Sequence, residues 1–236
     1  MTDTAAHPRR PLIYGRRQGH RLRGHQAELM TSLLPRLAIQ AHEPAELDPQ
    51  SLFAPVAGGG RRDIRLEVGF GGGEHLLARA AASPQTGFLG AEPFVNGIAK
   101  LLAGIEKQGL ANIRIHPDDA RDLIEWLAPG TIAGIDILYP DPWPKSRHNK
   151  RRFMRPETIA EMARIMSPGA ELLFASDIAD YVRWTEELMA DATGFKPCQS
   201  GADRWRYPPA DWPSTRYEKK ALAAGRKPAY LTYRRK

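Results

Sequence analysis

Four acidic side chains at or near the ends of predicted β-strands are the residues of this sequence best suited to binding a ligand. They are Glu67, Glu92, Asp119 and Asp141. The carboxyl ends of parallel strands meet at one edge of a sheet, where open α/β sheets bind ligands, so the four carboxylates are expected along one edge. There Glu92 can accept hydrogen bonds from both hydroxyls of a ribose, and Asp119 can accept one from an exocyclic amine of a base. The pattern predicts a nucleotide-type site.

A glycine-rich turn follows the first of these strands. Residues 64–68 carry the alternating apolar side chains of a strand, and a helix is predicted from Glu74. The glycines between them are Gly69, Gly71, Gly72 and Gly73. Glycine permits positive φ and close approach of the backbone to a ligand, and the amides at the start of the helix point back over the turn. The turn therefore opens a cofactor site.

The spacing of the glycines distinguishes between cofactors. A dinucleotide-binding fingerprint, G-x-G-x-x-G, requires its third glycine at the position that Glu74 occupies, so an NAD enzyme is disfavoured. The form E-x-G-x-G-x-G, which starts at Glu67, resembles that of S-adenosylmethionine-dependent methyltransferases. A cationic sulfonium cofactor has no pyrophosphate to bind and suits an acidic rim. We therefore expect S-adenosylmethionine.

A second distinctive stretch is residues 140–153, in which three prolines within five residues precede a cationic run. Because proline continues neither a strand nor a helix interior, the loop is expected to be stiff and to present Asp141 at the edge of the sheet. Trp143 offers an aromatic face for a base, and the cationic run can follow phosphates. The run comprises Lys145, Arg147, His148, Asn149, Lys150, Arg151 and Arg152. The loop predicts a nucleic-acid substrate.

The basic charge is concentrated in three stretches. Residues 1–25 hold six, residues 145–155 six and residues 215–236 eight of the 34 lysines and arginines, with only Asp3 and Glu218 as acids among them. The remainder of the chain has more acids than bases, although the formal net charge is +7. Basic stretches around an acidic body favour a polyanionic partner, most simply nucleic acid.

Alternating strand and helix patterns predict a doubly wound α/β sheet. Strands are predicted at 64–68, 87–91, 112–116, 135–139, 171–175 and 230–234, and helices at 26–39, from 74 onward, at 95–107, 156–166 and 178–191. Residues 197–214 are expected to be irregular, with room for a sixth strand and an insertion. We expect residues 1–40 to form a mobile basic extension with a short helix, and residues 41–236 to form the S-adenosylmethionine-binding domain.

The composition bounds the class of protein. A single cysteine, Cys198, excludes an internal disulfide framework and fits a reducing cytoplasm. No apolar run approaches the roughly 18 residues of a membrane span, and the N-terminus lacks the apolar core of a secretory signal. The histidines show no metal-ligand spacing. We expect a cytoplasmic protein with no membrane segment and no metal.

Together these motifs resemble the tRNA (guanine-N7-)-methyltransferase family in its bacterial single-chain form. The resemblance covers roughly residues 64–236 and depends most on the loop PDPWPKSRHNKRR, together with the glycine turn, Glu92, Asp119 and the segment Thr215–Glu218. Family members commonly have histidine where this chain has Pro144. The resemblance implies a Rossmann-like class I methyltransferase fold, a mostly parallel seven-stranded sheet with helices on both faces. It also implies methyl transfer from S-adenosylmethionine to N7 of the guanine at position 46 in the variable loop of tRNA.

The resemblance further implies a role for each site residue. Cofactor contacts are assigned to Glu67, Gly69, Gly71, Gly73, Glu92, Asp119 and Asp141, and contacts to the substrate guanosine to Lys145, Asp177, Thr215, Arg216, Tyr217 and Glu218. RNA contacts are assigned to Arg147, His148, Asn149, Lys150, Arg151 and Arg152. Guanine N7 carries no proton, so Asp141, the predicted catalytic residue, is expected to orient the base and compensate charge rather than accept a proton. No obligate protein partner is expected, and the chain is a monomer or a homodimer.

Other functions remain open at this stage. An aspartate followed by proline and an aromatic residue, as at Asp141, also occurs in amino-group methyltransferases, so another Rossmann-fold methyltransferase acting on rRNA, an amino group, a small molecule or a protein is an alternative. The basic run Arg147–Arg152 argues against a small molecule. A non-catalytic RNA-binding protein is a further alternative, although it would not need the glycine turn and the four acids.

Overall fold

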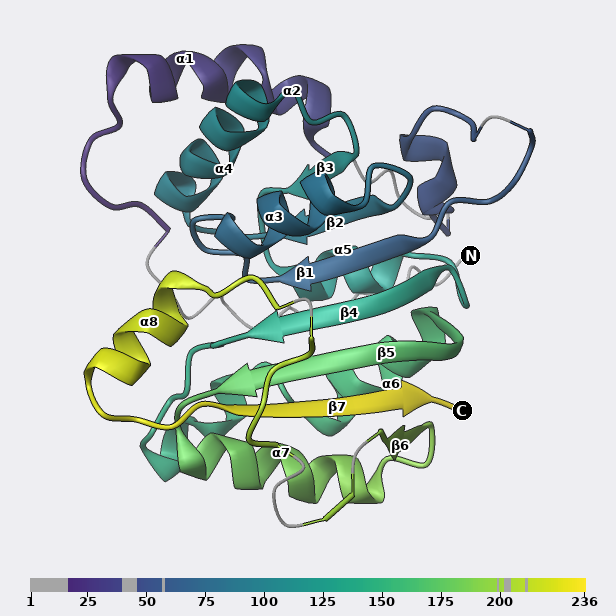
Figure 1. The fold of residues 1–236 in the computed structure, drawn as a ribbon, viewed down its shortest axis with the longest axis vertical. Coiled ribbons are helices and arrows are strands. Elements are labelled where there is room, and N and C mark those ends of the chain that lie inside the picture. Colours follow the sequence, from purple (N-terminus) through teal and green to yellow (C-terminus); the bar gives the residue numbers. More distant parts are fainter. Residues whose placement is uncertain (1–16, 40–45, 57, 199, 202–204, 211) are drawn as a thin grey trace, which may run out of the picture.

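A seven-stranded sheet forms the centre of the molecule, in the order β3-β2-β1-β4-β5-β7-β6 (Figure 1). The computed structural model describes residues 17–39, 46–56, 58–198, 200–201, 205–210 and 212–236. The strands are β1 (Ile64–Val68), β2 (Gly87–Ala91), β3 (Ile113–His116), β4 (Ile132–Leu138), β5 (Met166–Ser176), β6 (Phe195–Pro197) and β7 (Ala229–Arg235). The first five in the sheet order run parallel, and β7 is antiparallel to both of its neighbours. The predicted α/β class with a mostly parallel sheet is confirmed.

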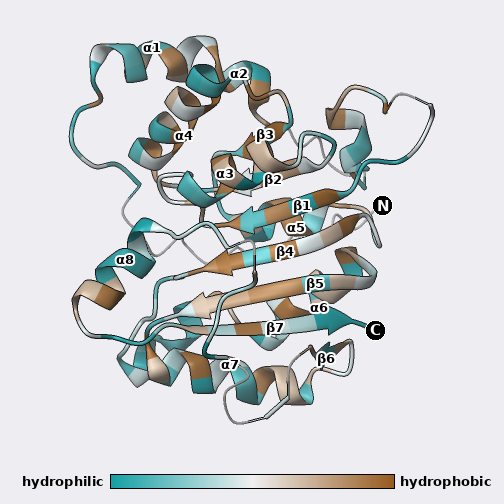
Figure 2. Cartoon of the chain, in the orientation of Figure 1, coloured by the Kyte–Doolittle hydropathy of each residue, from teal (hydrophilic) through white to brown (hydrophobic). Residues whose placement is uncertain are grey.

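Helices cover both faces of this sheet (Figure 1). They are α1 (Gly24–Ser32), α2 (Leu34–Leu37), α3 (Glu74–Ala82), α4 (Val95–Gln108), α5 (Ala120–Trp126), α6 (Pro156–Ile165), α7 (Ala179–Asp191) and α8 (Arg216–Ala223). Neighbouring side chains of a strand point to opposite faces, so Phe88 packs with α1 to α4, whereas Leu89 packs with α5 to α7. Figure 2 shows mainly apolar residues along β5, a polar end of β7, and apolar and polar residues mixed along the helices. No helix in the described ranges is long and apolar enough to span a bilayer.

The predicted strands are all present, and the differences from prediction lie in short or charged elements. The fifth strand is longer than expected. The sixth lies at Phe195–Pro197 and so ends where the stretch expected to hold it, 197–214, begins. Helices α5 and α8 were not predicted, because seven and eight residues give too little periodicity to recognise. The predicted N-terminal helix is interrupted near Pro35, as expected. Pro35 lies in the first turn of α2, the part of a helix in which proline is tolerated.

Residues 17–39 pack as part of the domain. Leu29 and Leu37 are buried in one hydrophobic cluster with α4, and the Ile39 N–H donates to the Ile115 carbonyl of β3 at 2.8 Å. Nearer the N-terminus, the Gly19 N–H donates to the side chain of Asn96 at 2.6 Å. The predicted boundary at residue 40 therefore does not separate an extension from the domain. Of the residues predicted to be mobile, 1–16 lie outside the described residues.

The order of the strands determines where a ligand can bind. The chain crosses from β1 through α3 to β2 on one side, and the later strand β4 pairs with the opposite edge of β1. Connections therefore diverge between β1 and β4, which leaves a crevice outside their carboxyl ends. The start of α4 closes this crevice at Gly97, where an added Cβ would lie 2.1 Å from the carbonyl oxygen of Gly71.

Replacing Gly97 by alanine should lower the free energy of unfolding by about 1–3 kcal/mol, because a backbone carbonyl cannot rotate away from the new methyl group. Chemical denaturation measures the difference, provided that the unfolding free energy of both proteins depends equally on denaturant concentration. The control is Gly24→Ala at the start of α1, where an added Cβ meets nothing within 4 Å. Equal losses in the two variants would contradict the close packing of α4 on the glycine turn.

Candidate active site

A cavity of about 420 Å³ opens at the carboxyl ends of β1, β2 and β4. Its walls are the glycine turn, the start of α4, the residues before α5, the loop after β4 and the start of α8. The predicted site residues that line it are Gly69, Gly71, Glu92, Asp119, Asp141, Arg151, Arg216 and Tyr217. Segments that are far apart in the sequence, predicted to bind cofactor, substrate and RNA, therefore share one cavity.

The glycine turn needs its glycines for conformational reasons. Gly69, Gly71 and Gly73 have φ angles of 69°, 56° and 78°, a region that side chains with a Cβ rarely adopt. The Gly69 N–H donates to the Ala91 carbonyl of β2, and the Gly73 N–H donates to the Phe70 carbonyl, both at 2.8 Å. Gly73 precedes α3 as its cap residue and does not line the cavity.

Glu92 ties the glycine turn to the start of α4. Its Oε2 accepts a hydrogen bond from the Gly71 N–H at 2.7 Å, and its Oε1 accepts one from the Phe94 N–H at 2.9 Å. Burial raises the pKa of Glu92 above its ordinary value, although both backbone hydrogen bonds act to lower it. Each carboxylate oxygen can accept a further hydrogen bond, so Glu92 keeps the capacity to bind hydroxyl groups in the cavity.

Asp119 is the N-cap of α5. Its Oδ1 accepts from the Arg121 N–H at 3.0 Å and its Oδ2 from the guanidinium of the same residue at 2.9 Å. These bonds hold the carboxylate in one orientation at the cavity wall, and each oxygen can accept once more. Asp119 therefore fits the predicted acceptor for an exocyclic amine.

Asp141 lies at the cavity rim in a strained segment. Tyr139 and Trp143 have φ angles of 51° and 42°, a left-handed conformation that costs a residue other than glycine about 1–3 kcal/mol. Such strain persists only where surrounding contacts impose it, and it is concentrated at functional sites. Asp141 is exposed as a whole, but desolvation of its carboxyl group by the cavity wall raises its pKa.

Arg152 holds this loop from within the protein, which corrects its predicted contact with RNA. Its side chain is 1% exposed, its Nε donates to the Pro142 carbonyl at 2.9 Å, and a terminal nitrogen pairs with Asp180. The guanidinium carbon lies 4.9 Å from the ring centroid of Tyr181 and 5.3 Å from that of Trp184. A guanidinium buried in this way has no surface to offer a phosphate. Arg152 therefore positions the loop after β4.

The other residues of the predicted RNA-binding run lie closer to the surface. Arg147 and Lys150 are exposed, His148 and Asn149 are half-buried, and Lys145 is exposed just before the short 3₁₀ helix Ser146–Arg151. Arg151 lines the cavity, and its guanidinium carbon lies 5.1 Å from the ring centroid of Trp143. Near its C-terminal end the basic run therefore reaches the cavity wall at Arg151, and its earlier residues lie outside the cavity.

Glu67 does not reach the cavity. It is the fourth residue of β1, one before the strand ends, so its side chain lies on a face of the sheet rather than over the edge. There its Oε2 lies 2.7 Å from His75 Nδ1, and both side chains are buried. Burial raises the pKa of Glu67. Burial acts to lower the pKa of His75, but the hydrogen bond and charge of Glu67 raise it above its ordinary value.

Four predicted substrate-binding residues also lie outside the cavity: the exposed Lys145, and Asp177, Thr215 and Glu218. Asp177 pairs with Arg226, its Oδ2 2.5 Å from Nε. Thr215 is the N-cap of α8, where its Oγ1 accepts from the Glu218 N–H at 3.0 Å. The buried carboxylate of Glu218 accepts hydrogen bonds from Trp212 and from a tyrosine of β7. Of the segment Thr215–Glu218, only the two central residues face the cavity.

Some lining residues were missed from the sequence. Tyr139, Phe94, Gly97 and Lys100 all contribute to the cavity wall. Tyr139 directly follows β4, a position that could have been recognised as a site position. The other three belong to the start of α4, and an apolar helix pattern gives no indication of which turn faces a ligand.

A family described as "Putative methyltransferase" matches residues 61–231 of this chain. A tRNA (guanine-N(7)-)-methyltransferase of Agrobacterium fabrum is 48% identical over 236 residues, which cover 100% of both chains. A protein of the same name from Nitrobacter hamburgensis is 49% identical over 94% of this chain and 86% of its own length. The chain belongs to the tRNA (guanine-N7-)-methyltransferase family.

Solved structures add information on the fold alone. The 16S rRNA methyltransferase KamB is 20% identical, with a TM-score of 0.55, over 79% of this chain and 91% of its own. The [4+2]-cyclase SpnF is 18% identical, with a TM-score of 0.50, over 74% of both chains. The similarity to both confirms the Rossmann-like class I architecture. Because the two proteins have different names and share one fold, the fold does not identify a substrate.

Replacing Arg152 by alanine should cost at least about 2 kcal/mol of unfolding free energy, because a buried carbonyl acceptor and two aromatic rings lose their partner. The matched control is Arg147→Ala in the same loop, whose exposed side chain should change stability by less than about 0.5 kcal/mol. Urea denaturation of both variants measures the difference. Similar small losses in both would show that Arg152 is a surface cation.

Proposed function

We propose that this chain transfers a methyl group from S-adenosylmethionine to N7 of the guanine at position 46 in the variable loop of tRNA. The observation that carries the proposal is the single cavity that joins the glycine turn to Asp141 and Trp143, with the basic run at its wall. Relatives at nearly half identity over the full length bear the name tRNA (guanine-N(7)-)-methyltransferase. Their names suggest the substrate, and the cavity supplies the chemistry that such a substrate needs.

The residues of the cavity fit S-adenosylmethionine. The glycine turn and Gly97 leave a cradle without side chains, and a Cβ at Gly97 would fill part of it. Glu92 and Asp119 are held by backbone donors and have acceptor capacity for ribose hydroxyls and for an amine. When bound, S-adenosylmethionine supplies an electrophilic methyl group on a positively charged sulfur. The acidic rim suits that charge, whereas it would repel the pyrophosphate of a dinucleotide.

Methylation of guanine N7 requires no general base from the protein. Guanine N7 has an in-plane lone pair and no proton, so it is a nucleophile as it stands. The protein can contribute alignment of the base and compensation of the positive charge that develops on the purine. Asp141, at the cavity rim, is the proposed orienter. Its carboxylate can accept from the guanine N1–H and amino group, which adenine does not present in that pattern.

Aromatic side chains around the cavity suit a planar base. Tyr139, Trp143 and Tyr217 all line it, and the rings of Tyr139 and Tyr217 are nearly parallel, with 20° between their planes. Base–aromatic stacking contributes about 1–3 kcal/mol per base. Arg216 beside Tyr217 supplies a cation at the same wall. Lys145 and Asp177 remain proposed contacts to the guanosine, Asp177 from its pair with Arg226.

Binding of RNA over the basic run would offset the cost of exposing the target base. Extracting a base from its contacts costs a few kcal/mol. Each phosphate neutralised by lysine or arginine releases counterions and recovers free energy. Exposed Lys145, Arg147 and Lys150 belong to the same loop as Trp143 and Arg151, which line the cavity. This supports the proposal that they contact the nucleotides flanking the target.

The test of the proposed function is incubation with methyl-labelled S-adenosylmethionine and unmodified tRNA, followed by mapping of the modified base. We expect label at N7 of the guanine in the variable loop, and Asp141→Asn should lower kcat at least about 100-fold because the orienting charge is lost. A methyl group on another atom, on rRNA or on a protein would overturn the substrate. An essential base near Asp141 in the pH–rate profile would overturn its role as an orienter.

The two ligands should differ in their dependence on salt. Between about 50 and 200 mM salt, affinity for tRNA should fall at least about 100-fold, because several phosphates are neutralised. Affinity for S-adenosylmethionine should change by less than about twofold, because its contacts lie inside the cavity, where screening is weak. Filter binding and calorimetry measure the two slopes, and equal slopes would contradict this division of the site.

A further inference from the structure

We infer that Glu67, His75, Trp212 and Glu218 form an internal column that holds the start of α8 over the cavity, with His75 and Trp212 as positioning residues for the substrate. The inference rests on the proposed function for the identity of that substrate. It assigns Glu67 and Glu218 a structural role inside the protein, whereas the family resemblance assigns them contacts with ligands.

One end of the column is the contact between Glu67 and His75, beneath the glycine turn inside the protein. Glu67 of β1 and His75 of α3 are 4% and 3% exposed, and their side chains are 2.7 Å apart. These residues flank the turn on both sides, so their contact ties the end of β1 to the first turn of α3. Breaking a buried pair of this kind is costly, because the remaining polar group loses its partner.

The middle of the column is the indole of Trp212. Its ring centroid lies 5.0 Å from that of His75 at an interplanar angle of 45°, and 5.4 Å from that of Tyr230 at 75°. Edge-to-face and tilted ring pairs in this range are attractive. Trp212 is therefore wedged between α3 and β7, in a segment that has no regular secondary structure of its own.

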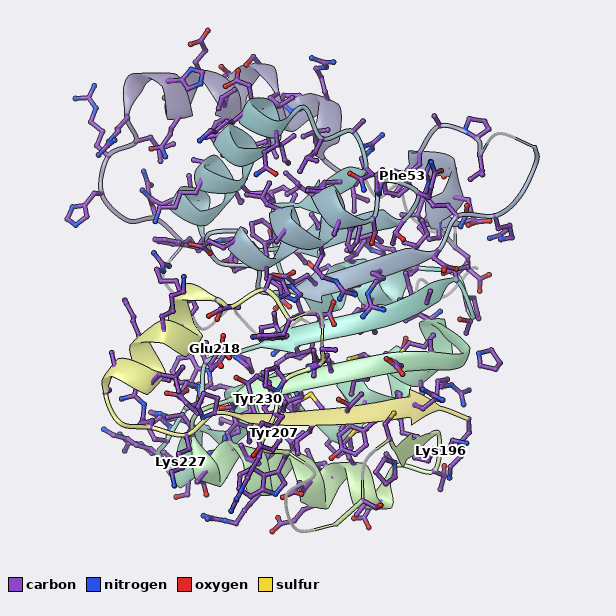
Figure 3. All side chains as sticks on the ribbon, in the orientation of Figure 1. Phe53, Lys196, Tyr207, Glu218, Lys227 and Tyr230 are labelled. Atoms are coloured by element: carbon purple, nitrogen blue, oxygen red, sulfur yellow. The ribbon has the colours of Figure 1, made fainter. Side chains whose placement is uncertain are left out.

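The other end of the column is the carboxylate of Glu218, a residue that is 5% exposed. It accepts a hydrogen bond from Trp212 Nε1 at 2.9 Å and another from the hydroxyl of Tyr230. Figure 3 shows Glu218 beside α8 and Tyr230 near the start of β7. Because both carboxylate oxygens are engaged inside the protein, Glu218 holds the helix rather than a ligand.

The column matters for the site because α8 has little support of its own. It is eight residues long, and isolated helices of that length are unstable in water. Its first residues, Arg216 and Tyr217, nevertheless form one wall of the cavity, and a Cβ on Gly71 would meet Tyr217 at 3.4 Å. The column therefore joins two walls, the glycine turn through His75 and α8 through Glu218.

The decisive variant is Trp212→Phe, which keeps a ring between His75 and Tyr230 and removes the N–H donor to Glu218. We expect the KM for tRNA to rise about tenfold, the effect of one hydrogen bond to a charged group, while the Kd for S-adenosylmethionine changes less than about threefold. The matched control is Trp205→Phe. This half-buried indole in the same segment packs on the main core, outside the column, and its replacement should leave both constants unchanged.

Conservative substitution of Glu218 separates positioning from direct contact. In Glu218→Gln the amide oxygen can still accept from Trp212, so the KM for tRNA should stay within about threefold of the wild-type value, whereas Glu218→Ala should raise it at least about tenfold. If Glu218 instead bound the guanine as a carboxylate, glutamine and alanine would be equally damaging. Tyr230→Phe, which removes the second donor and keeps the ring, should act in the same direction as Trp212→Phe.

Amide hydrogen exchange of the ligand-free protein provides a measurement that does not depend on the reaction. In Trp212→Phe the amides of α8 should exchange at least about tenfold faster, and those of α6 should be unchanged. If the wild-type protein methylates no tRNA but α8 is loosened, the proposed function fails and the column stands. If the wild-type protein is active and Trp212→Phe alters neither the KM for tRNA nor the exchange of α8, the column is overturned.

Discussion

The close approach of Gly97 to the carbonyl of Gly71 is the constraint on which the cavity depends. With no side chain at either position, the start of α4 can lie directly on the glycine turn. Glu92 then reaches across the junction and accepts from the backbone of both segments. Any side chain at Gly97 would push α4 away from the turn, and Glu92 would lose one of its two donors. The shape of the cofactor end of the cavity is thus determined by backbone contacts.

The substrate end depends on contacts made from inside the protein. The loop after β4 contains two non-glycine residues with positive φ, and such a conformation persists only where its surroundings impose it. Arg152 is part of those surroundings, since it binds the Pro142 carbonyl while buried between two aromatic rings of α7. The residues of the basic run therefore differ in role. Its last residue, Arg152, shapes the loop, and its exposed residues are the ones proposed to contact RNA.

The four acids differ in orientation for a simple geometric reason. Glu92, Asp119 and Asp141 come after their strands have ended, so the chain is free to turn them over the edge of the sheet. Glu67 is still within β1, where alternation places its side chain on a face. Glu218, in the first turn of α8, likewise points inward, where Trp212 and Tyr230 donate to its carboxylate. Position within an element, more than residue type, decides which acids can meet a ligand.

The sequence by itself determined the α/β class, the predicted strands and the position of the cavity at their carboxyl ends, because apolar periodicity and glycine turns are local properties. The chemistry proposed at the glycine turn and in the loop at Asp141 also comes from the sequence. Tertiary structure alone decided that Arg152 is buried, that Glu67 and Glu218 face inward, and that α8 closes the cavity. Those outcomes depend on packing between segments that are far apart in the sequence, such as His75 on Trp212, and no local pattern encodes such a contact.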